Sequence, residues 1–90
     1  MKRNNNFNAF EVNGRHLLIP NAEQAKVFDG IVAINETGRF LWDLLQAEHT
    51  VSTMAQALAD QYEVSAADVT ADVQTFINTL AEAGAVEGSL

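Results

Sequence analysis

The chain has 90 residues, of which 48% are hydrophobic, and its formal net charge is −7 at pH 7. This length suits one small domain with its own core, and the lack of cysteine excludes a disulfide framework and any thiolate metal site. No apolar run could span a bilayer, the polar N-terminus shows no secretory signal, and the acidic balance disfavours nucleic acid and anionic membranes as partners. We therefore expect a single cytoplasmic domain.

The first third of the sequence predicts three short strands. Residues 1–6 are rich in asparagine and are expected to form a disordered N-terminal tail. Residues 7–12 alternate apolar and polar side chains, which is the period of a half-buried strand. Asn13-Gly14 follows as a strong hairpin signal, and residues 15–20 form a second strand that stops at the only proline.

A third strand is predicted where a β-branched run begins. Residues 21–29 read as a loop, or as one turn of helix around residues 22–25. The run Gly30-Ile31-Val32-Ala33-Ile34 then has the composition of a strand.

The remainder predicts three amphipathic helices, each with a start signal. Asn35 caps the first helix, which reaches about Gln46. Gly38 inside it costs up to ~1 kcal/mol relative to alanine, so we expect it to mark a close approach of another backbone. Thr50 caps the second helix, and its apolar face comprises Val51, Met54, Ala55, Leu58 and Tyr62.

The third helix is predicted to begin after Ser65, with Asp68 three residues later in a capping-box-like start, and to end at Gly84. Its apolar stripe comprises Val69, Val73, Phe76, Ile77 and Leu80. Three strands cannot bury their apolar face alone, so they must pack on the helices. The predicted fold is α+β, with a three-stranded antiparallel N-terminal sheet packed on three C-terminal helices in a winged helix-turn-helix-like domain over residues 7–87.

Charge conflicts with the function that this fold usually has. Residues 40–90 contain eight acidic residues and no lysine or arginine. A helix-turn-helix domain that binds DNA needs cations that displace counterions from the phosphates. The sequence therefore disfavours a winged-helix DNA-binding regulator.

Catalytic chemistry is not visible in the sequence. His16 and His49 lie far apart with no carboxylate at a ligand-like spacing, and we interpret both as strand-surface or loop residues. There is no phosphate-binding glycine motif and no serine in a nucleophile-elbow setting. We expect no catalytic residue, no metal site and no cofactor.

Residues 34–45 carry a family resemblance. They read Ile-Asn-Glu-Thr-Gly-Arg-Phe-Leu-Trp-Asp-Leu-Leu, which resembles the first-helix motif of PqqD-like proteins. Later segments resemble the same family: Thr50-Val51 opening a helix, residues 58–62 closing it, and the spaced set Val69, Asp72, Val73, Phe76, Leu80 and Gly84. The match covers roughly residues 7–87. The Asn-Glu-Thr-Gly opening and the acidic last half depart from the archetypal cofactor-pathway protein, so the resemblance places the chain in the wider family.

This resemblance implies a non-catalytic peptide-recognition element for ribosomally synthesised, post-translationally modified peptides. Such domains bind the leader peptide of a precursor as an added strand between the third strand and the third helix. They present it to a maturation enzyme, such as a radical S-adenosylmethionine (radical SAM) enzyme or a leader peptidase. Lasso peptide pathways and radical-SAM-modified peptide pathways both use them.

The residues themselves suggest where a peptide would bind. A short β-branched edge strand is a template for strand addition, which points to Gly30, Ile31, Val32, Ala33 and Ile34. On the third helix either flank of the core stripe can border the groove, one with Asp72, Phe76 and Thr79 and the other with Thr70, Ile77 and Ala81. We choose the first flank, together with Asp68, because an acid beside an aromatic ring suits a side chain with an apolar stem and a basic head.

Two readings besides leader binding and DNA binding stay open from the sequence. The chain could be an accessory subunit that stabilises a partner modification enzyme without binding a peptide. It could also be a small enzyme, which a bound metal or cofactor in the purified protein would indicate. Phe76 is equally compatible with the core and with a pocket, and Trp42 is expected in the core.

Overall fold

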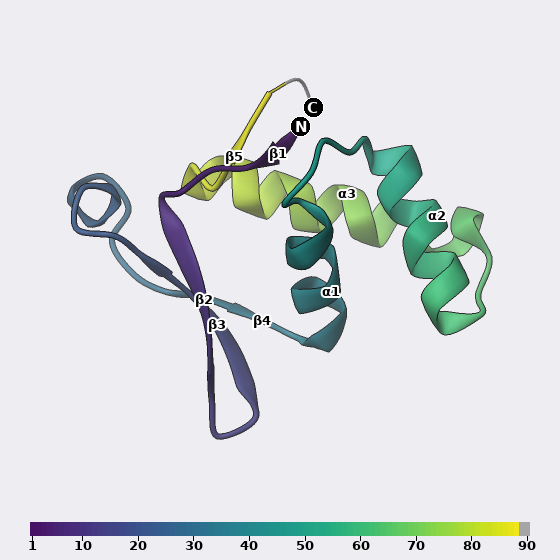
Figure 1. Ribbon diagram of the computed structural model, residues 1–90, viewed down its shortest axis with the longest axis horizontal. Helices are drawn as coiled ribbons and strands as arrows, with labels where there is room; N and C mark the ends of the chain where they lie inside the picture. Colours follow the sequence, from purple (N-terminus) through teal and green to yellow (C-terminus); the bar gives the residue numbers. More distant parts are fainter. Residues whose placement is uncertain (89–90) are drawn as a thin grey trace.

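The computed structural model describes residues 1–88. Figure 1 shows a β-hairpin that extends away from a group of helices, with both described ends of the chain close together. In chain order the elements are β1 (Lys2–Arg3), β2 (Phe7–Val12), β3 (Arg15–Pro20), a 3-10 turn η1 (Gln24–Lys26), β4 (Val32–Ile34), α1 (Glu36–Leu44), α2 (Val51–Tyr62), α3 (Ala66–Ala83) and β5 (Val86–Glu87).

The main sheet is three-stranded and antiparallel, as predicted, and its strand order is β2-β3-β4. Asn13 and Gly14 form the hairpin turn with φ of 53° and 79°, the left-handed values that this dipeptide tolerates. On the other side of β3, Leu18 pairs with Val32 and His16 pairs with Ile34. Because β4 is last in the strand order, its outer edge has no strand partner within residues 1–88.

The third strand is shorter than predicted. The sequence indicated residues 30–34, whereas β4 begins at Val32. Gly30 has φ +133°, a conformation open to glycine and not to extended L-residues, so the chain turns there before the strand starts. Ile31 is 56% exposed and lies outside the ladder.

The predicted helices are present, and two of the three predicted caps form. The Asn35 side chain accepts a hydrogen bond from the Gly38 N–H at 2.7 Å, and Thr50 and Thr53 form a reciprocal capping box. Ser65 occupies the N-cap of α3, but its side chain makes no capping bond, so the predicted capping-box-like start is wrong. Gly84 ends α3 with φ 76°, as its position predicted.

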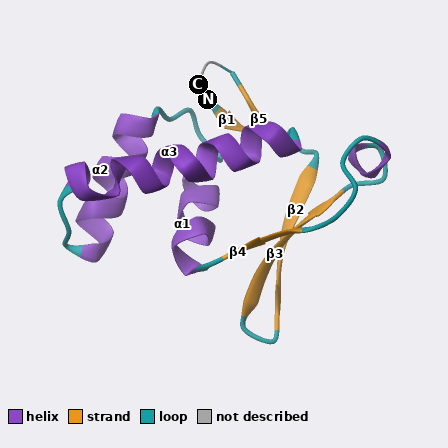
Figure 2. Cartoon of the chain, turned by 180° about the vertical axis from the view of Figure 1, so that it is seen from behind, coloured by secondary structure: helices purple, strands orange, loops and turns teal. Residues whose placement is uncertain are grey.

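The core lies where the inner face of the sheet meets the helices. Its largest fully buried side chains are Trp42, Leu18, Leu45, Met54, Ile77, Leu80 and Val73. In Figure 2, α3 passes in front of α1 and connects the region of α2 with the region of β1 and β5. Tyr62 departs from the prediction, because it is 45% exposed and packs edge-on against Phe40 with ring centroids 6.1 Å apart.

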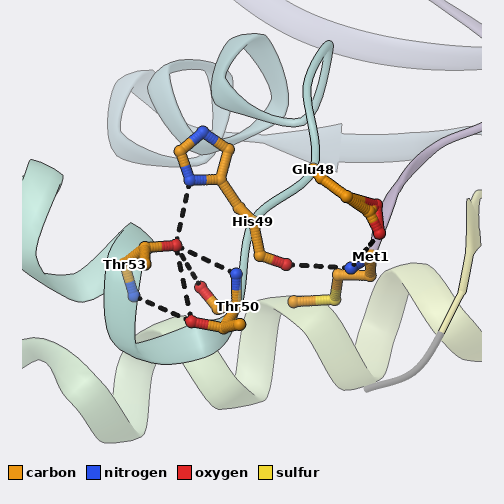
Figure 3. A network of polar contacts seen from close by, with 5 residues as sticks. All are labelled: Met1, Glu48, His49, Thr50 and Thr53. Carbon is orange, nitrogen blue, oxygen red and sulfur yellow. Dashed lines mark hydrogen bonds and ion pairs between the residues drawn. The ribbon is translucent and has the colours of Figure 1, made fainter.

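The N-terminal segment is part of the fold, which corrects the prediction of a disordered tail. Its strand β1 pairs with β5, and Met1 is only 5% exposed. The Met1 amine donates to the His49 carbonyl and pairs with the Glu48 carboxylate, both at 2.9 Å, beside the capping box of α2 (Figure 3). The asparagines make tertiary bonds that composition cannot reveal: the Asn4 and Asn6 amides both donate to the Gly84 carbonyl.

Candidate functional site

A groove of about 540 Å³ lies between the open edge of β4 and one face of α3. All three residues of β4 line it, together with the first turn of α1, which follows β4 directly. Its lining residues are Val32, Ala33, Ile34, Asn35, Thr37, Gly38, Leu41, Leu58, Asp72, Thr75, Phe76 and Thr79. Its volume falls in the range of ordinary ligand sites.

The inner part of the groove is apolar and depends on Gly38. This glycine is buried, and a Cβ placed on it would lie 3.1 Å from the Ile34 Cβ and 3.1 Å from the Phe76 Cε1. The close approach predicted for Gly38 is therefore real, but side chains make it and not a backbone. Leu41 and Leu58, which are 2% and 3% exposed, complete the apolar lining.

The α3 side of the groove is polar. Asp72, Thr75 and Thr79 are exposed and follow one another at spacings of three and four, so they share a face of the helix. The Thr79 hydroxyl donates to the Thr75 carbonyl at 3.1 Å, which leaves its oxygen able to accept a further bond. Asp72 is the only charged residue among those lining the groove.

The structure brings together six of the nine residues predicted for this site: Val32, Ala33, Ile34, Asp72, Phe76 and Thr79. It also settles which flank of α3 borders the groove, because Thr70, Ile77 and Ala81 lie outside the lining. Gly30 and Ile31 precede the strand, and Asp68 lies in the first turn of α3 outside the lining.

Sequence reasoning missed six lining residues: Asn35, Thr37, Gly38, Leu41, Leu58 and Thr75. Three of them belong to the start of α1, which was interpreted as a helix cap, a close approach at Gly38 and a family motif, and not as part of the site. Thr75 had a signal that could have found it, since it lies three residues after Asp72 on the same helix face. Leu41 and Leu58 belong to the buried core and also line the groove, so the sequence pattern identifies them only as core residues.

The two histidines lie outside the groove lining. His16 lies on β3 and His49 precedes Thr50, and both are half-buried. No group of three or more His, Cys, Asp and Glu side chains within residues 1–88 is placed to hold a metal ion. Of the helices described, none is long and apolar enough to cross a membrane.

The fold and groove define a class of protein: a small winged-helix-like α+β domain whose sheet keeps an open edge facing a helix. A family model described as coenzyme PQQ synthesis protein D (PqqD) matches residues 17–86, which is 70 of the 90 residues. The chain belongs to the PqqD family, as the resemblance indicated.

Two solved structures share the fold. One is described as TbiB1 in complex with the TbiA(beta) leader peptide; its TM-score is 0.75 at 19% identity, over 100% of this chain and 99% of that one. The other is a lasso peptide synthetase B1 complexed with the leader peptide; its TM-score is 0.72 at 18% identity, over 97% of this chain and 96% of that one. No curated protein sequence matches the chain significantly.

Proposed function

We propose that this chain binds the leader peptide of a ribosomally synthesised, post-translationally modified peptide precursor and presents it to a maturation enzyme, without catalysing a reaction itself. The observation that carries the proposal is the edge of β4 that has no strand partner among residues 1–88, beside the groove between β4 and α3. Two proteins of the same fold were solved with leader peptides, which supports this assignment.

Strand addition explains how such a groove holds a peptide of variable sequence. An extended peptide beside β4 would satisfy the outward backbone N–H and C=O groups of that strand. Alternate side chains of the peptide would then enter the groove, and the others would face away from it. Main-chain bonds would supply general affinity, and the groove would supply selectivity.

The proposal is tested by titrating ¹⁵N-labelled protein with a synthetic leader peptide from the precursor gene nearest to that of this chain. Amide shifts are expected at residues 32–38 and 72–79, and a scrambled peptide of the same composition is the control. A flat response to the leader, or shifts confined to β1 and β5, would contradict the proposal.

Strand addition itself is tested by N-methylating the leader one residue at a time. In an added strand, alternate N–H groups point toward β4. Within the few leader residues that pair with its three residues, methylation at alternate positions should therefore weaken binding, while the intervening positions tolerate it. Equal tolerance at all positions would rule out a ladder between peptide and β4.

Presentation to an enzyme is tested separately. The maturation enzyme encoded nearest to this gene should modify a full precursor faster when this chain is present. The same enzyme should gain nothing on a core peptide that lacks the leader. An equal gain on both substrates would favour an accessory subunit that stabilises the enzyme.

A further inference from the structure

We infer that the groove selects a leader with a basic residue held at Asp72, two positions away from an apolar residue held over Phe76. This inference rests on the proposed leader binding and names the class of leader. Three features of the structure carry it: the isolation of the Asp72 carboxylate, the distribution of cations over the molecule, and the spacing along α3.

Asp72 has no ionic or hydrogen-bonding partner among residues 1–88. Several exposed acids share this property, including Glu82 on the same helix, and Asp72 differs from them because it lines the groove. By contrast, Asp43 lies 3.1 Å from the Arg39 guanidinium and 3.9 Å from that of Arg3. Glu48 pairs with the Met1 amine at 2.9 Å. The one acid that lines the groove is thus left without a cation at the place where a ligand would lie.

The protein offers no side chain of its own to supply that cation nearby. Residues 40–90 contain no lysine or arginine, and α3 carries only the acids Asp68, Asp72 and Glu82. The basic residues all lie in the first 39 positions, and none of them lines the groove. Because the molecule as a whole has a net charge of −7, its field also favours the approach of a cationic peptide.

The spacing of the groove residues sets the spacing expected in the peptide. Asp72 and Phe76 are four residues apart on a helix, which places them about 6 Å apart along its axis. In an extended peptide, side chains on the same face are two residues apart and about 6.7 Å apart. For a leader strand that runs along the axis of α3, a basic side chain at Asp72 therefore fits an apolar residue at Phe76 that is its second neighbour. The strand direction decides which of the two comes first.

The expected size of the effect is modest because Asp72 lies at the polar side of the groove. A charge in that position acts chiefly on the association rate and on salt dependence. We expect Asp72→Asn to weaken binding of such a peptide by about two- to fivefold at low salt, as for a solvent-exposed ion pair. Asn keeps the size of the side chain, so the apolar part of the groove stays intact.

The inference is tested by selecting random 14-residue peptides by mRNA display on the immobilised full chain. We expect enrichment of Lys or Arg two positions from a large apolar residue. Asp72→Asn should lose the basic preference and keep the apolar one, and Asp72→Lys should select Asp or Glu instead. Glu82→Gln is the matched control, because it removes one charge from α3 outside the groove lining.

The outcomes separate this inference from the proposed function. Amide shifts can show that selected peptides bind the groove. If these peptides have no enrichment of basic residues, or the same enrichment with Asp72→Asn, the role of Asp72 is overturned and leader binding stays intact. If Asp72→Asn and Glu82→Gln reduce the preference for basic residues equally, that preference comes from overall charge, and the specific role of Asp72 is again overturned. A library that yields no groove-binding peptide would count against the proposed function itself.

Discussion

At the residue scale, a few side chains decide whether the groove exists. Gly38 was visible in the sequence as an anomaly, since glycine inside a helix has a cost. What it approaches could not be read from the sequence, because Ile34 and Phe76 come from two other elements. A local pattern can thus mark a special position without revealing the tertiary contact that explains it.

Substitution of Gly38 by alanine should separate binding from stability. The gain in helix propensity and the cost of crowding are both about 1 kcal/mol and oppose each other, so the free energy of unfolding should change by less than about 1 kcal/mol. The two side chains that must shift both line the groove, so leader affinity should fall about fivefold or more, which is about 1 kcal/mol. Chemical denaturation and a binding titration measure the two effects, and unchanged affinity would contradict the assigned role.

Two N-cap residues offer a matched pair. Thr50 makes a reciprocal capping box with Thr53, whereas Ser65 makes no side-chain capping bond. We expect Thr50→Ala to lower the free energy of unfolding by about 1 kcal/mol and Ser65→Ala to lower it by less than about 0.5 kcal/mol. Urea denaturation of both variants checks this, and equal losses would show that capping by the Thr50 side chain contributes nothing special.

At the element scale, periodic patterns predicted the two long strands and the three helices. They left both flanks of α3 open, and the flank beside the groove was chosen from the chemistry of Asp72 and Phe76. The patterns failed where tertiary pairing decides the structure. The strand β1 has two residues, and nothing in Lys2-Arg3 predicts that it pairs with β5. Similarly, the start of β4 depends on the backbone turn at Gly30 and not on the β-branched composition around it.

Removal of residues 1–6 should therefore destabilise the domain. The deletion loses the β1–β5 pairing, the burial of Met1 and the two asparagine bonds to Gly84. We expect the free energy of unfolding to fall by about 3 kcal/mol or more, from one buried apolar side chain and several net hydrogen bonds. The control is Lys2→Ala in the full chain, because Lys2 is exposed. If the unmodified chain, the deletion and Lys2→Ala unfold at the same temperature, residues 1–6 contribute no stability and the prediction is contradicted.

At the scale of the whole molecule, charge is divided along the chain. The first 39 residues hold all five basic residues, and the rest holds eight of the twelve acids. The fold was predictable from the sequence at this scale because alternation and helical periods agree with each other along the chain. The groove was implied only by the family resemblance, and its full lining was not predictable, because the lining depends on how closely β4 and α3 approach.

The uneven charge predicts how stability responds to salt. Repulsion among the acids of the second half should weaken as ions screen it. Raising NaCl from about 10 to about 300 mM should increase the free energy of unfolding by less than about 1 kcal/mol, since exposed charges interact weakly. Urea denaturation across this range tests it, and a decrease would show that the ion pairs of Asp43 outweigh the repulsion.

The length of β4 has a consequence for the lifetime of a complex. Of its three residues, one or two point their N–H and C=O groups outward, so a ladder there has at most four bonds. At about 1 kcal/mol each, they contribute at most about 4 kcal/mol, from which the entropy cost of association must be subtracted. Residence time then depends on the few side chains in the groove, and a leader that fits them imperfectly leaves quickly. Under the proposed function, such fast release suits turnover, in which one copy of the domain binds many precursors in succession. It does not suit long-term storage of one precursor.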